Sequence, residues 1–221
     1  MGRILKAMLK LQEIEAGEFS SWLRDTLTAL KNDTEMDVPC GKCNSCCRSS
    51  YFIHIKPDET DTLSHIPGEL LFPAPGLPEG NVLMGYDEKG HCPMLKNGAC
   101  SIYEHRPLTC RSYDCRIFPA TGIQISGKDK ILINRQVERW KFSLTKPEDV
   151  ELQKAAKKSA SFLKNKSKLF PPGELPGNAT QLAIMALKVY DLFLEEGDKL
   201  VDDKKMVEAV VQAGEKFNSP G

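Results

Sequence analysis

Apolar residues recur with the spacing of a helix at both ends of the chain. Near the N-terminus, one apolar stripe runs from Ile4 to Leu11, and Gly17 separates it from a second stripe. This second stripe consists of Phe19, Leu23, Leu27 and Leu30. Because residues three or four positions apart share one face of a helix, the pattern predicts that the first thirty residues are helical.

Further helices are predicted in the last third of the chain. Residues 145–148 (Thr-Lys-Pro-Glu) have the form of a capping box with proline at the helix start, which predicts a helix through about Leu163. Asn178 can cap a second helix through Glu196, which is apolar on nearly all sides and should be buried or at an interface. A last helix is expected near 203–213.

The middle of the chain, from Met36 to about Thr121, has short elements rich in cysteine, proline and glycine. The alternation at 51–55 predicts a strand, and the prolines and glycines of 67–90 favour an ordered loop or lid. Two more short strands are predicted at 123–125 and 131–133. All eight cysteines lie in this middle section, so a constraint other than regular secondary structure must organise it.

These elements together predict an α+β fold that is mainly α-helical. We expect an N-terminal helical segment (1–35), a loop-rich cysteine and metal core with short strands (36–125), and a C-terminal helical region (126–221). The helices at both ends would pack on the core. At 221 residues, the chain is long enough to form one globular unit with a real hydrophobic interior.

Charge and hydropathy narrow the classes of partner. Thirty basic and thirty acidic side chains cancel, which gives no reason to expect a nucleic acid or an anionic membrane as partner. Lys6 and Lys10 interrupt the start, so no secretory signal is visible, and no apolar run reaches the roughly 18 residues of a membrane span. We therefore expect a cytoplasmic protein. In that reducing compartment, metal ligation is a better use for eight cysteines than disulfides.

The densest chemical signal is a run of four cysteines within eight residues, Cys40, Cys43, Cys46 and Cys47. Two residues between cysteines let a tight turn aim both sulfurs at one metal. The intervening Gly41 and Asn44 suit the left-handed backbone of such turns. Neighbouring side chains of an extended or helical backbone diverge, so Cys46 and Cys47 should have different roles.

Four later cysteines, Cys92, Cys100, Cys110 and Cys115, can complete one site or build a second one. Three ligands from the first run and one from this group would suit tetrahedral zinc or a cubane iron–sulfur cluster. Pro93 follows Cys92, which favours iron, because a cysteine followed by proline also occurs in bacterial ferredoxins. The spacing differs from theirs, and the residues leave zinc and iron open.

The cysteine section resembles the YkgJ-type CxxCxxCC family. The resemblance covers about the central third of the chain and rests on 40–48, 90–95 and 98–111. It implies a zinc- or iron-chelating domain, and related cysteine clusters also occur in flagellin lysine methylases. The implied metal positions are Cys40, Cys43, Cys46, Cys47, Cys92, Cys100 and Cys110, and Cys115 is a further candidate outside this set.

Other polar residues near the cysteines have two readings each. Arg106, Arg111 and Arg48 could stabilise thiolates or could form ordinary ion pairs. Among the histidines, His91 beside Cys92 is the best candidate for an extra ligand, although a hydrogen-bonding role is favoured. The scattered carboxylates Asp114, Glu104 and Asp58 are assigned no role.

The leading hypothesis is a metal-binding protein that holds either zinc or iron. One form of this hypothesis places the iron in a 4Fe-4S cluster. One alternative is an iron–sulfur-dependent oxidoreductase or other cluster-dependent enzyme, such as a protein lysine methylase. A further alternative is an interaction module with structural zinc and a protein partner. Convincing hydrolase, kinase and zincin motifs are absent from the sequence. The sequence leaves open the number of centres, the catalysed reaction and the oligomeric state.

Overall fold

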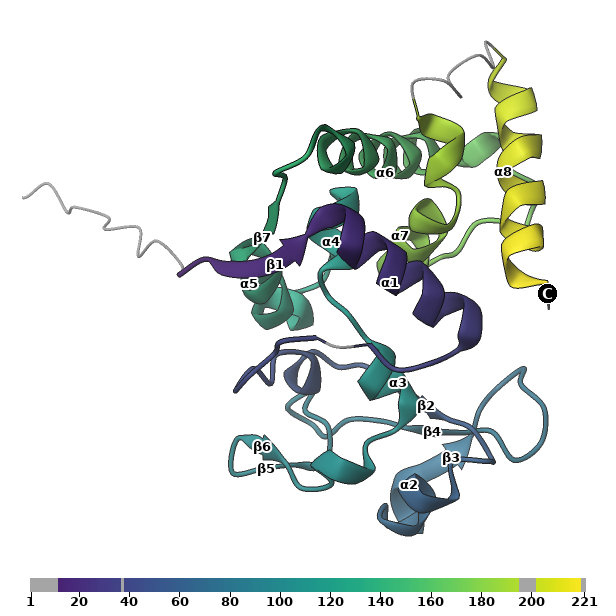
Figure 1. Cartoon of the computed structure of the whole chain (residues 1–221). Coiled ribbons are helices and arrows are strands. Elements are labelled where there is room, and N and C mark those ends of the chain that lie inside the picture. Colours follow the sequence, from purple (N-terminus) through teal and green to yellow (C-terminus); the bar gives the residue numbers. More distant parts are fainter. Residues whose placement is uncertain (1–11, 37, 195–201, 220–221) are drawn as a thin grey trace, which may run out of the picture.

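The computed structural model describes residues 12–36, 38–194 and 202–219, which divide into two regions (Figure 1). The upper region in Figure 1 is here called the helical body and comprises residues 12–32, 113–194 and 202–219. The lower region, here called the cysteine region, comprises residues 38–112. The fold is α+β and mainly α-helical, as the sequence predicted.

The helical body surrounds a short parallel pair of strands. Strand β1 (Ile14–Glu18) pairs with β7 (Trp140–Ser143), although more than a hundred residues separate them in the chain. The α-helices are α1 (Phe19–Asn32), α4 (Ile117–Thr121), α5 (Ile131–Arg139), α6 (Pro147–Asn165), α7 (Ala179–Lys188) and α8 (Asp203–Asn218). The 3-10 turns are η4 (Lys128–Lys130), η5 (Ser167–Leu169) and η6 (Tyr190–Phe193).

Two apolar clusters hold the helical body together. The first joins α1 to α4, α5 and β7 around Phe19, Phe118 and Trp140, which are all buried. The second joins α6, α7 and α8 around Leu163 and Val210. Alanines on the buried face of α6 let neighbouring helices approach closely, and burial of these apolar surfaces is the main stabilising term.

The cysteine region is built from short elements. Its three-stranded antiparallel sheet has the order β2-β4-β3, and Met84 is paired with both Ile53 and Leu71. A small buried cluster beneath it consists of Ile55, Ile66, Met84, Met94 and Ile102. The elements are η1 (Cys46–Arg48), β2 (Ile53–Ile55), α2 (Thr60–Ser64), η2 (Gly68–Leu70), β3 (Leu71–Pro73), β4 (Val82–Met84), β5 (Leu95–Lys96), β6 (Ala99–Cys100), η3 (Tyr103–His105) and α3 (Leu108–Ser112).

Four predicted helices and one strand are confirmed, with shifted ends. Helix α6 begins as expected, but its N-cap is Lys146, whose N–H donates to Asp149 Oδ2 at 3.0 Å, so Glu148 does not close the box. The Asn178 side chain caps α7 by accepting from Gln181 N at 2.9 Å. Helix α7 ends at Lys188 and is followed by η6, whereas the predicted end at Glu196 lies outside the described residues. Helix α8 is longer than expected.

Other predicted elements were wrong. Residues 14–18 form β1 and not a helix, while the stripe from Ile4 to Leu11 lies outside the described residues. The predicted loop 67–90 contains β3 and β4. Residues 131–133 begin helix α5 and do not form a strand, because Ile133 and Gln136 have helical spacing and face the protein core together. Residues 123–125 are irregular. In the ranges that the structure describes, no helix combines the length and apolar character needed to cross a membrane.

Candidate metal centre

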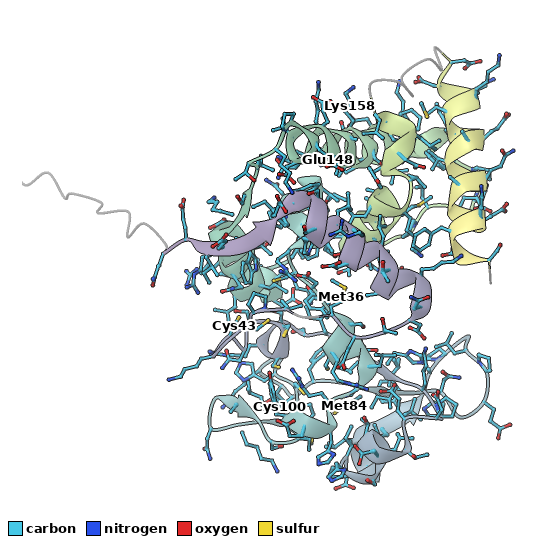
Figure 2. The ribbon with its side chains drawn as sticks, in the orientation of Figure 1. Met36, Cys43, Met84, Cys100, Glu148 and Lys158 are labelled. Atoms are coloured by element: carbon cyan, nitrogen blue, oxygen red, sulfur yellow. The ribbon has the colours of Figure 1, made fainter. Side chains whose placement is uncertain are left out.

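All eight cysteines line one cavity of about 1640 Å³. The cysteine region supplies most of its wall, and the helical body supplies Ile133 and Gln136 from α5 and Ala179 from the start of α7. Figure 2 shows Cys43 just beneath the helical body and Cys100 farther down in the cysteine region. The eight thiols are free, so each is available as a ligand.

The loop between α1 and η1 presents the first cysteines through a tight turn. Cys43 N donates to Cys40 O at 2.9 Å, and Gly41 has the expected left-handed backbone with φ of 54°. Asn44 does not adopt the left-handed backbone that we predicted. Its side-chain amide instead donates to Gly98 O at 2.8 Å, which ties this loop to the β5–β6 hairpin that carries Cys100.

Cys46 and Cys47 form the start of the 3-10 turn η1 and have different electrostatic states. The Cys47 thiol hydrogen-bonds to the Cys46 sulfur, which lowers the pKa of Cys46 to about 7 despite the opposing effect of burial. The same contact and burial raise the pKa of Cys47 well above its ordinary value. The two sulfurs are therefore in contact, and the divergence of the side chains that we expected is not found, whereas the different roles of Cys46 and Cys47 stay a prediction.

Backbone contacts bring the later cysteines toward η1. Cys92 N donates to Cys47 O at 2.8 Å, and Ser50 N donates to Gly90 O at 3.0 Å. Gly90 has a φ of 76°, and a Cβ atom there would lie 2.3 Å from Ser50 Oγ, so this crossing requires glycine. Burial raises the pKa of Cys110, and the charges of Cys46, Cys92 and Cys100 raise it further, so these four thiols share one electrostatic environment.

Cys115 comes from the helical body, where it is buried beside Trp140. Trp140 Nε1 donates to Cys115 Sγ at 3.1 Å, while burial raises the pKa of this thiol to about 12. Charges of Cys40 and Cys43 also act on it. Burial, followed by the charges of Cys46 and Cys43, raises the pKa of Cys40 to about 11. Cys40, Cys43 and Cys115, here called the second group, are thus linked by their charges, and Cys46 also acts on Cys40.

A buried ion pair fixes the backbone on both sides of Cys115. Arg116 Nε lies 2.9 Å from Asp114 Oδ2, and both side chains are almost fully buried. Asp114 also accepts a hydrogen bond from Trp22 Nε1 at 2.8 Å, and Arg116 donates to Ala16 O at 3.1 Å. Sequence reasoning gave Asp114 no role and overlooked Arg116. The available signal was a charged pair on the two neighbours of a cysteine.

Other residues proposed from sequence take separate roles. The guanidinium of Arg106 lies 3.6 Å from the Tyr103 ring centre. Its charge contributes to the lowered pKa of Cys46 and opposes the rise in the pKa of Cys110. Arg111 forms an ion pair with Glu35 at 3.4 Å and donates to Arg106 O at 3.0 Å. Arg48 donates to His91 Nε2 at 3.4 Å, which agrees with a hydrogen-bonding role for this histidine.

The separation of the sulfurs bears on the kind of metal. Among the described residues, no three cysteine Sγ atoms lie within 4.8 Å of one another. Thiolates around a single tetrahedral zinc, with bonds of about 2.3 Å, would be about 3.8 Å apart. A cluster places its ligands on separate iron atoms and therefore farther apart. The donor set of soft thiolates fits zinc or iron.

Comparison with known proteins gives a family for this part of the chain. Residues 39–137 match the model of the family CxxCxxCC, described as "Putative zinc- or iron-chelating domain". No curated protein and no solved structure matches the chain. The matched segment contains all eight cysteines, including Cys115, and it extends through most of α5. Over residues 39–137 the chain is therefore similar to the CxxCxxCC family, which is described as a zinc- or iron-chelating domain.

Proposed function

We propose that this chain is an iron-binding protein whose thiolates hold an iron–sulfur cluster in the cavity between the two regions. The observation that carries the proposal is that eight thiols line one cavity while no three of the sulfurs, all in described positions, are as close as a single zinc requires. Metal binding itself agrees with the family match. When bound, a cluster would supply a one-electron redox centre.

The proposed cluster ligands are Cys46, Cys92, Cys100 and Cys110. The pKa of Cys110 responds, after burial, to the charges of the other three, which is expected when four sulfurs surround one space. The pKa of Cys92 responds in the same way to Cys100 and Cys46. Cys47 would position Cys46 through the hydrogen bond between their two sulfurs. Cys40, Cys43 and Cys115 remain as candidate ligands of a second centre.

The chain's own residues would tune such a centre. Arg106 places a positive charge near Cys46 and Cys110, which favours their thiolate forms and offsets part of a cluster's negative charge. The backbone N–H of Cys92 already donates a hydrogen bond to Cys47 O and would not donate to a cluster sulfur. The wall from α5 and α7 limits access of water on the side of the helical body.

A second candidate function is a cluster-dependent enzyme. The cavity volume of about 1640 Å³ exceeds the roughly 300–1000 Å³ of ordinary ligand pockets, so a substrate could lie beside a cluster. Tyr51 and Tyr113 line the cavity with their hydroxyl groups 3.4 Å apart, and the Lys130 amine lies 4.1 Å from the Tyr51 ring centre. These polar groups would contact a substrate that entered the cavity.

We also propose a reducing, cytoplasmic location. The reason is chemical, because thiolate ligands must stay reduced to bind metal, and all eight cysteines are free. An oxidising compartment would favour disulfides among the thiols that line the cavity. Localisation of the full chain with a tag, combined with thiol counting after rapid alkylation, tests this part.

Anaerobic purification followed by iron, zinc and acid-labile sulfide analysis tests the main proposal. We expect a brown protein with iron and sulfide in similar amounts. Cys110→Ser should lose most of the iron, whereas Cys115→Ser, in the second group, should retain the optical spectrum of the cluster. A colourless protein with stoichiometric zinc and no sulfide would instead establish the interaction module with structural zinc.

A further inference from the structure

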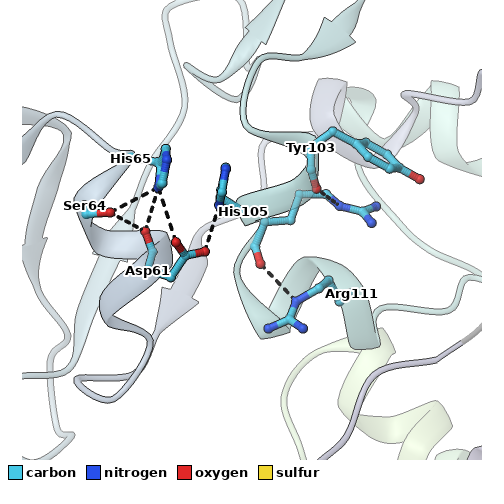
Figure 3. A network of polar contacts seen from close by, with 7 residues as sticks. Asp61, Ser64, His65, Tyr103, His105 and Arg111 are labelled. Carbon is cyan, nitrogen blue, oxygen red and sulfur yellow. Dashed lines mark hydrogen bonds and ion pairs between the residues drawn. The ribbon is translucent and has the colours of Figure 1, made fainter.

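Three metal-ligating side chains converge on the surface, outside the lining of the thiol cavity. They are Asp61 and His65 on and just after α2, and His105 at the end of η3 (Figure 3). Their ligand atoms all lie within 4.8 Å of one another, and no other such trio occurs among the residues placed by the structure. In Figure 3 the two imidazole rings face each other above the Asp61 carboxylate.

The distances in this trio are close to those of a metal site. His105 Nδ1 lies 2.8 Å from Asp61 Oδ2, and His65 Nδ1 lies 3.8 Å from Asp61 Oδ1. Two ligands of tetrahedral zinc with bonds of about 2.0–2.1 Å are about 3.3 Å apart, which falls between these values. A bound ion would therefore replace the proton in the His105–Asp61 hydrogen bond with little movement of the carboxylate.

The two rings must rotate out of their stacked arrangement to share an ion. They are stacked with centroids 3.5 Å apart and an interplanar angle of 6°. Because a metal lies in the plane of each imidazole that binds it, parallel rings have to tilt toward each other. Their side chains are 39% and 38% exposed, for His65 and His105 respectively, so solvent gives both rings room to rotate.

The backbone that carries the trio is fixed by contacts outside it. Glu59 accepts from Lys56 N at 2.9 Å and from Leu108 N at 2.5 Å, which joins the start of α2 to the start of α3. Ile66 and Ile102, which flank the two histidines in sequence, are buried in the same apolar cluster. The ligands are thus held near each other before any ion binds, which lowers the entropic cost of binding.

The local charge also favours a cation. A shallow cavity of about 200 Å³ beside the trio is lined by four carboxylates and two guanidinium groups. The carboxylates are Asp58, Glu59, Asp61 and Glu104, and the guanidinium groups are those of Arg106 and Arg111.

We propose that Asp61, His65 and His105 form a surface site for a divalent transition-metal ion such as zinc, separate from the thiolate centre. Two imidazoles and one carboxylate are a donor set that suits zinc and its neighbours and disfavours calcium or magnesium. Three protein ligands leave a coordination position open to water or to a ligand in the shallow cavity. The site does not depend on which metal the cysteines hold.

The test uses the full chain, purified anaerobically with its cysteine centre loaded. Zinc chloride is titrated while the ring nitrogens of all four histidines are followed by NMR. We expect saturable shifts of His65 and His105 and unchanged signals from His54 and His91. Asp61→Asn should weaken zinc binding at least tenfold, whereas Asp58→Asn removes the same charge from the same cavity without removing a ligand and should change it less than twofold.

Two results would overturn the site. In one, zinc binds while the His65 and His105 signals move no more than those of His54 and His91. In the other, Asp61→Asn and Asp58→Asn weaken binding equally, which would reveal only a diffuse attraction of cations to carboxylates. Because Asp61 is on the surface, its variant should keep the backbone NMR spectrum of the folded chain, which is checked in the same experiment.

Discussion

The helical body and the cysteine region are held together by different means. In the described part of the chain, the helical body has buried apolar clusters of 14 and 10 residues, whereas the cysteine region has one cluster of five. Burial of apolar surface is the main source of folding free energy, so the helical body buries enough of it to be stable without a metal. The cysteine region has too little and is expected to depend on its metal, as small metal-binding domains do.

Removal of the metal should have the largest effect, and it should act on one region. Binding of structural metal contributes on the order of 10–16 kcal/mol in small zinc domains. We expect a chelator under anaerobic conditions to abolish hydrogen-exchange protection in β2, β4 and α3. Protection in α1, α6 and α7 should persist. Equal loss of protection in both regions would contradict the comparison.

Loss of the buried carboxylate at Asp114 should destabilise the junction of the two regions. Asp114→Ala removes the carboxylate from the buried ion pair with Arg116, which costs about 3–5 kcal/mol. The effect should appear in the global unfolding free energy measured with denaturant, and Cys115 should become reactive to alkylation. A matched control is Asp25→Ala on the exposed face of α1, which should change stability by less than about 0.5 kcal/mol.

Gly90→Ala should have a smaller effect that is confined to the cysteine region. The new Cβ would collide with Ser50 Oγ, and the left-handed backbone adds strain of about 1–2 kcal/mol. The variant should lose metal faster on dilution into chelator. Adding Ser50→Ala removes the colliding oxygen and should restore part of the retention, whereas Gly214→Ala, with open space at its Cβ position, should retain metal like the wild type.

The pH dependence of metal uptake sharpens the same comparison. Burial raises the pKa of Cys40 to about 11 and that of Cys115 to about 12, so both thiols are protonated at pH 7 in the metal-free protein. Each one that becomes a ligand must release a proton, and affinity should therefore rise with pH by up to about tenfold per unit and per proton. Calorimetry in buffers of different ionisation enthalpy counts these protons, and a pH-independent affinity would contradict their role as ligands.

Sequence alone predicted the elements that carry local signals. The apolar stripe of α1, the proline at the start of α6 and the Asn178 cap all act within one or two helical turns. The cysteine run was equally visible, because a chelating turn needs only a few residues. These features depend on neighbours in the chain, so their physical basis can be read without a fold.

Contacts between distant segments were outside the reach of sequence. Residues 14–18 form a strand because they pair with β7, whereas the helical spacing of nearby apolar residues led us to predict a helix. Asp114 gained a role only through Trp22 and Arg116 in the folded core. Likewise, His105 meets Asp61 across 44 residues of chain. A partner brought in by tertiary structure leaves no local pattern in the sequence.

The most direct test of the central claim is iron K-edge X-ray absorption on the full chain purified anaerobically. We expect a first shell of sulfur around iron and a second shell of iron, as a thiolate-held cluster in the cavity requires. A first shell of nitrogen or oxygen, or a protein whose cysteines hold zinc and no iron, would contradict the account.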